Sequence, residues 1–148
     1  MKNGNGKVKE YDYNGVLEFE GELINGERNG NGKEYYSDSK LQFEGDYLNG
    51  KRWNGKGFNK NDNIEFELKD GKGHVKEYNY DDNLIFEGEY LNGERNGNGK
   101  EYNYDGTLLF EGEYLNGKRW NGKGKEYNYD SELLFEIKYL NRKRNKKN

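Results

Sequence analysis

A short unit that repeats along the chain constrains the fold more than any other feature. The tripeptide Phe-Glu-Gly occurs in two pairs, at positions 19 and 43 and at positions 86 and 110, and the members of each pair lie 24 residues apart. Degenerate copies begin at Phe66 and Phe135. About six tandem units of this length predict a repeat protein, in which each unit packs its few apolar side chains on the next.

The sequence also has a second, longer period. Phe19 and Trp53 recur as Phe86 and Trp120, in both cases 67 residues further along the chain. This constant offset indicates that one block has been duplicated. The sequence therefore predicts a single array over 1–148, with an internal duplication of 4–72 and 73–148 and a degenerate, basic last unit at 137–148.

Within one unit the apolar residues alternate with polar ones. Phe110, Gly112 and Tyr114 fall on one face of an extended segment, whereas Glu111 and Glu113 fall on the other. A period of two is typical of a half-buried β-strand, and Asn-Gly or Asp-Gly supplies the positive φ angles of tight hairpin turns. We therefore predict an all-β fold, an elongated single-layer antiparallel meander of stacked hairpins on the order of 60 Å long.

Composition excludes several other classes. The mean hydropathy is −1.46, yet aromatic residues make up 16% of the chain, which is too many for a disordered protein. The absence of Cys excludes a disulfide framework and thiol chemistry, and no apolar run approaches the roughly 20 residues that span a bilayer. We expect a cytoplasmic location, either free or peripheral to a membrane or the cytoskeleton.

The chain offers little for catalysis. His74 is the only histidine, so no catalytic triad and no two-histidine zinc site can be assembled. Gly50 to Lys56 nearly match a phosphate-binding loop but lack the following Ser or Thr and a helix. The alternating carboxylates of Glu111 and Glu113 recur in almost every unit, as on a solvated sheet face. We predict no enzyme activity, no cofactor and no metal.

These motifs resemble a known family. The pattern Phe110-x-Gly112-x-Tyr114-x-x-Gly117, followed by Gly122-x-Gly124, resembles the MORN repeat and recurs in phase over nearly the whole chain. Phe in place of the usual first Tyr and an extra residue at each Trp place it near the divergent variant of that family. The resemblance implies one elongated, twisted sheet of hairpins. It also implies protein binding, dimerisation or scaffolding, with phospholipid binding as a further family property and no catalytic residues.

Two sets of residues are candidates for binding. Exposed rings on an aromatic face would hold a protein partner or a second copy of the chain, and these rings are Tyr47, Trp53, Tyr90, Tyr114 and Trp120. The alternative is an anionic membrane lipid held by Lys51, Arg52, Lys118, Arg119, Arg142, Lys143 and Arg144. The net charge of −3 disfavours nucleic acid. A third interpretation makes the chain a targeting segment of a larger enzyme.

Overall fold

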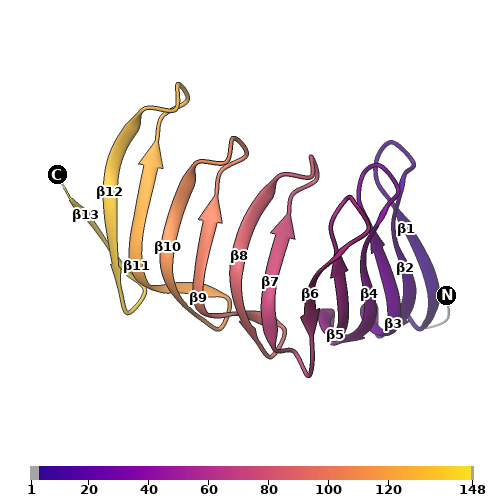
Figure 1. Ribbon diagram of the computed structural model, residues 1–148. Coiled ribbons are helices and arrows are strands. Elements are labelled where there is room, and N and C mark those ends of the chain that lie inside the picture. Colours follow the sequence, from indigo (N-terminus) through magenta and orange to yellow (C-terminus); the bar gives the residue numbers. More distant parts are fainter. Residues whose placement is uncertain (1–3, 148) are drawn as a thin grey trace.

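A computed structural model describes residues 4–147 and only the backbone of Lys147; residues 1–3 and 148 of the expected array lie outside it. This part of the chain forms thirteen strands and no helix. Every strand pairs antiparallel with its sequence neighbours, except at one break in the middle, so the strands follow one another in chain order (Figure 1). The predicted all-β meander of hairpins is confirmed.

The strands form two sheets. The first sheet contains β1 (Gly6–Tyr11), β2 (Leu17–Ile24), β3 (Glu27–Tyr35), β4 (Leu41–Leu48), β5 (Lys51–Phe58) and β6 (Ile64–Leu68). The second contains β7 (Gly73–Tyr78), β8 (Leu84–Leu91), β9 (Glu94–Tyr102), β10 (Leu108–Leu115), β11 (Lys118–Tyr127), β12 (Leu133–Leu140) and β13 (Lys143–Lys147).

The break between β6 and β7 corrects the expectation of one continuous sheet. Only the bridge between Lys69 and Lys72 joins the two strands. Phe66, Leu68 and Val75 are buried in one cluster at this point, and Val75 is fully buried. These side chains fill the space between the strands, so β6 and β7 pack through side chains where the other neighbours pair through the backbone.

Two kinds of connection alternate along the array. At one edge, here called the turn edge, two residues join the strands, and Asn49 and Gly50 both have positive φ, at 50° and 81°. This is the geometry of a type I′ hairpin turn. The amide of Gly50 donates to the carbonyl of Arg28 at 2.8 Å, and Gly117 repeats this bond to Arg95. Each turn is thereby tied to the preceding hairpin.

The opposite edge, here called the loop edge, carries five-residue loops. In the first loop the amide of Asp12 donates to the carbonyl of Val16 at 2.8 Å. The Asp12 carboxylate accepts the amides of Asn14 and Val16, both at 2.8 Å. Asn59 and Asn128 play the same part in their own loops. Short Asp and Asn side chains stabilise such loops because they replace backbone acceptors locally.

The last hairpin differs from what the sequence suggests. Loss of the turn glycine at position 142 predicts that this hairpin cannot continue as the others do. Instead Asn141 and Arg142 adopt the same positive φ angles, 47° and 67°, and β13 pairs with β12 over five residues. The Arg142 amide donates to the carbonyl of Trp120 at 2.9 Å. Hydrogen bonding to the preceding hairpin therefore holds a non-glycine residue in the left-handed region.

The core is a row of phenylalanines lying on glycines. A Cβ added to Gly99 would lie 2.7 Å from the ring of Phe86 and 3.1 Å from that of Tyr114, so only glycine leaves room for both rings. Phe86 belongs to the core cluster of the second sheet and Phe43 to that of the first, and Tyr90 packs against both. The core therefore continues across the break, whereas the backbone pairing is reduced there to the Lys69–Lys72 bridge.

Candidate functional site

Arginines cover the buried phenylalanines. The guanidinium carbon of Arg28 lies 3.9 Å from the ring centre of Phe19, and that of Arg95 lies 4.2 Å from the ring centre of Phe86. The same contact recurs at Arg52 over Phe43 and at Arg119 over Phe110. Such cation–π contacts stabilise both partners. The aromatic face, the side of the sheets that bears these rings, thus carries guanidinium groups over its phenylalanines.

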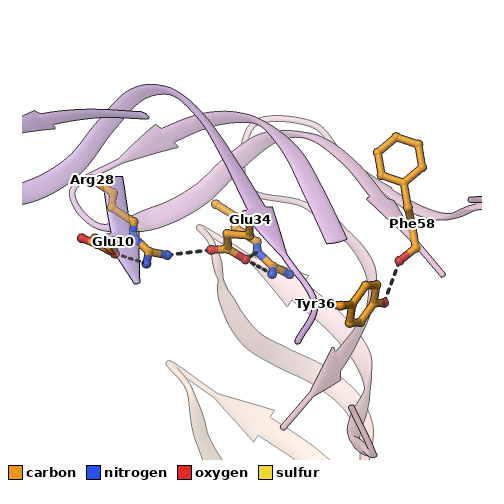
Figure 2. A network of polar contacts seen from close by, with 6 residues as sticks. Glu10, Arg28, Glu34, Tyr36 and Phe58 are labelled. Atoms are coloured by element: carbon orange, nitrogen blue, oxygen red, sulfur yellow. Dashed lines mark hydrogen bonds and ion pairs between the residues drawn. The ribbon is translucent and has the colours of Figure 1, made fainter. Parts of the chain in front are cut away.

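Carboxylates join these arginines into ladders that run across the strands. In the first sheet Glu34 bridges two arginines: it accepts from Nη1 of Arg28 at 2.8 Å and from Nε of Arg52 at 2.9 Å. Glu10 binds the other side of Arg28 at 2.5 Å. Figure 2 shows Glu10, Arg28 and Glu34 in one row. Each arginine is therefore neutralised within the sheet.

The electrostatics of Glu34 follow from its neighbours. Its side chain is only 14% exposed, and burial alone would raise its pKa. Arg52 and then Arg28 outweigh burial, so the pKa of Glu34 lies below its ordinary value. The carboxylate is charged at neutral pH and belongs to the structure of the sheet.

The second sheet repeats this arrangement. Glu101 accepts from Nε of Arg119 at 2.5 Å and from Nη1 of Arg95 at 3.1 Å. The hydroxyl of Tyr114 also donates to Glu101 at 2.6 Å. Burial by itself would raise the pKa of Glu101. The hydrogen bonds from Arg119 and Tyr114 lower the pKa, and the net shift is downward.

The aromatic residues proposed as a binding surface lie in three different settings. Tyr47 and Tyr114 are 3% exposed, so they belong to the core and are not available to a partner. Tyr90 is half-buried between the two core clusters. Trp53 and Trp120 are half-buried at β-bulges near the turn edge. The five rings therefore do not form one exposed row.

The bulges explain the two tryptophans. Each Trp is an extra residue that the partner strand does not match, as in a β-bulge. The ring of Trp53 lies against Gly71 of the next turn. The backbone carbonyl of Trp53 accepts a hydrogen bond from the Gly71 amide at 2.9 Å. These contacts give Trp53 a structural role at the turn edge.

The basic residues predicted to bind lipid fall into two groups, those that form ion pairs and those that are exposed. Arg52 and Arg119 are bound to Glu34 and Glu101, as described above, and Lys51 pairs with Glu94. Arg144 pairs with Glu126. The remaining three side chains are exposed and lie beside two neighbouring turns: Lys118, Arg142 and Lys143.

The loop of the β7–β8 hairpin contacts the loops of the first sheet. The hydroxyl of Tyr80 donates to the carboxylate of Asp12 at 2.5 Å. Asp82 accepts from the Ser37 hydroxyl and from Lys60, both at 2.6 Å. We call this set of contacts the loop clasp. Through it, three loops of the first sheet hold one loop of the second.

Tyrosines at the loop edge are the residues that sequence reasoning missed. Tyr104 is 65% exposed and Tyr129 is fully exposed, and each is the second residue of its five-residue loop. Two loops of the first sheet have Ser37 and Lys60 at this position, and both are used in the clasp, whereas its first loop has Tyr13, whose ring centre lies 5.7 Å from that of Tyr80. Aligning the loops of the two blocks would have revealed this difference.

The structure also bears on metal binding, on the single histidine and on membrane-spanning helices. Within residues 4–147 no group of three or more His, Asp or Glu side chains could hold a metal ion. His74 is exposed and lies 3.4 Å from Glu87. The described residues also contain no helix that is long and apolar enough to cross a bilayer.

Comparison with known families agrees with this geometry. The family model of the MORN repeat matches residues 19–40 and 86–108. The chain contains MORN repeats in these two segments. Each matched MORN segment begins at the buried Phe of one hairpin, passes through its two-residue turn and ends around the following five-residue loop. No curated protein matches the chain.

Proposed function

We propose that this MORN array is a non-enzymatic module that binds another protein through the loop edge of its second sheet. The observation that carries the proposal is the exposure of Tyr104 and Tyr129, at a loop position where two loops of the first sheet have the clasp residues Ser37 and Lys60. Large, rigid and amphipathic tyrosine side chains dominate many protein interfaces. Leu133 and Leu134, each 49% exposed, extend this surface from the last loop into β12.

The array suits such a role because its frame is fixed. Hydrogen bonds between turns and ion pairs between strands hold each hairpin relative to the next. Loops on a rigid frame bind with a small loss of conformational entropy. Scaffolding and self-association are two forms of the same proposal, with a different protein or a second copy of the chain as the partner.

The test is a pull-down with the double variant Tyr104→Ala, Tyr129→Ala, beside wild type. We expect the partner to be lost, with unchanged circular dichroism, because the removed rings make no core contact. The double variant Trp53→Ala, Trp120→Ala tests the opposite edge in the same experiment. If the partner survives the tyrosine changes, the loop edge is not the binding surface. Light scattering of the purified chain then separates a second copy from a different protein.

A lipid-binding function is the second candidate, and one observation favours it. Lys118, Arg142 and Lys143 gather at neighbouring turns and are exposed. Anionic headgroups are attracted to such clusters by about 1 kcal/mol per cation near the surface. Sedimentation with vesicles that contain phosphatidylserine, at low and at high salt, tests this function. Absence of binding at low salt would rule out the lipid-binding function.

A further inference from the structure

A cleft of about 530 Å³ lies between the first sheet and the β7–β8 hairpin. Arg52 and Gln42 line it from the first sheet, and Tyr78, Tyr80 and Tyr90 line it from the second. The loop clasp joins the two sides at the loop edge. The volume lies within the range of small-molecule sites. The proposed protein-binding surface lies on other loops and does not use this cleft.

The arginines and the lysine in the cleft walls are already neutralised. Arg28 and Arg52 share Glu34, and Lys51 is paired with Glu94. A phosphate or carboxylate would have to displace these carboxylates, which costs the existing ion pairs. The cleft is therefore not suited to an anionic ligand.

Tyrosine rings supply most of the apolar lining, together with Val16 and Ile85. The hydroxyl of Tyr78 donates to Glu65 at 2.7 Å, and that of Tyr80 donates to Asp12. Because these hydrogen bonds fix the hydroxyls, the rings are held in place and contribute mainly their carbon surface to the cleft. Ring surface of this kind suits the C–H faces of a ligand.

Two polar side chains in the cleft are left without a partner. The exposed Glu18 and the half-buried Gln42 line the cleft, and neither side chain makes a hydrogen bond or ion pair with a described residue. Both stand in β-bulges, as residues that the partner strand skips. Bulges redirect side chains and occur often beside functional sites. A carboxylate and an amide together accept from and donate to neutral hydroxyl groups.

The second block supplies an internal comparison. The residues 67 positions further on are Ile85 and Leu109, and they also stand in β-bulges. The fold therefore accepts an apolar residue at this position. In the first block the residues at this position are polar, and Glu18 and Gln42 line the cleft from β2 and β4, while Ile85 lines it from β8. We propose that the cleft binds a neutral sugar, a short oligosaccharide whose hydroxyl groups bond to Glu18 and Gln42 and whose ring faces pack on tyrosine.

Isothermal titration calorimetry with maltotriose, cellotriose and triacetylchitotriose tests the proposal, with inorganic phosphate as the charged probe. We expect saturable binding of at least one trisaccharide and none of phosphate. The variants Glu18→Ile and Gln42→Leu introduce the residues of the second block, so they keep the fold. Each should weaken binding about tenfold, as the loss of one hydrogen bond does. Leu109→Ala, at the matching bulge outside the cleft, should leave the affinity unchanged.

Several outcomes would overturn the sugar site. These are no saturable binding of any trisaccharide, binding of phosphate in preference, or equal affinities of wild type, Glu18→Ile and Gln42→Leu. A loss of affinity in Leu109→Ala equal to that in Gln42→Leu would also count against it. The result is independent of the protein-binding proposal, because the pull-down depends on Tyr104 and Tyr129, which lie outside the cleft.

Discussion

At the scale of single residues, the glutamates of the ladders determine how the aromatic face behaves. Glu34 and Glu101 each hold two arginines over the buried phenylalanines. A buried charge that loses its partner destabilises a fold more strongly than an exposed one. The ladders therefore couple the polar surface to the core, and they remove most of the arginines from any role in binding.

Replacing Glu34 by Gln should destabilise the protein by about 2 to 3 kcal/mol, because Arg28 and Arg52 would keep their charges without the shared carboxylate. Urea unfolding of the variant measures this free energy. The matched control is Glu44→Gln, since Glu44 is half-exposed and 3.7 Å from Lys33 on the other face. It should cost at most about 0.5 kcal/mol. Equal costs in the two variants would show that the ladder adds no stability.

Acid should weaken the fold through the same glutamates. The folded-state pKa values of Glu34 and Glu101 lie below the ordinary 4.5, so their stabilisation is fully present above pH 4.5. It is lost as the pH falls from there through the folded pKa values. Urea unfolding at pH 7, 5, 4 and 3 measures the loss. In Glu34→Gln the decrease should be smaller, and an unchanged decrease would assign acid unfolding to other groups.

At the scale of elements, the hairpin is the unit that keeps its geometry while its sequence changes. The β12–β13 hairpin retains the type I′ turn although Arg142 replaces glycine. The bulges retain their place whether they hold Glu, Gln, Ile or Leu. Backbone pairing and turn geometry therefore define the unit, and individual side chains specialise it.

Arg142→Gly should stabilise the protein by about 1 kcal/mol, because glycine adopts a positive φ at no steric cost. The melting temperature and urea midpoint report the change. At the equivalent position of another turn, Gly50→Ala should destabilise the protein by about the same amount. The φ angle of Gly50 is +81°, and an added Cβ would meet no atom within 4 Å, so the cost would come from the backbone conformation. If Arg142→Gly is neutral or destabilising, contacts of the arginine side chain outweigh the backbone strain.

At the scale of the whole molecule, several kinds of contact join the two sheets. The bridge between Lys69 and Lys72 connects them through the backbone, Tyr90 packs on both core clusters, and the loop clasp joins their loop edges. The clasp is the polar part of this connection at the loop edge, and the Lys51–Glu94 and Lys76–Glu65 ion pairs also cross between the sheets. Its release should loosen the loops of the first sheet without unfolding either sheet.

Asp82→Ala removes the contacts to Ser37 and Lys60, and it should speed amide hydrogen exchange in the 36–40 and 59–63 loops. The expected cost in stability is about 1 to 2 kcal/mol. Hydrogen exchange read by mass spectrometry measures the first effect and urea unfolding the second. Asp130→Ala, in an unclasped loop, is the control and should change neither. Unchanged exchange in Asp82→Ala would mean that the clasp does not hold the sheets together.

Much of the fold could be predicted from the sequence because it depends on local rules. Alternation of Phe, Gly and Tyr predicted the strands, Asn-Gly predicted the turns, and the recurring pattern indicated MORN repeats. These signals act within one hairpin, so they can be recognised without knowing where other hairpins lie. The extra residues at Trp53 and Trp120 likewise mark the positions of two bulges.

The sequence by itself thus determined the hairpins, their turns and the phenylalanine core on glycine. The tertiary structure alone decided which rings are buried, which arginines are neutralised and where the array breaks. Tyr47 and Tyr104 are both tyrosines of a repeat, yet one is 3% and the other 65% exposed. The difference depends on contacts between residues far apart in the chain, such as Tyr80 with Asp12. Such contacts arise from the curvature of the assembled sheets, which no single repeat encodes.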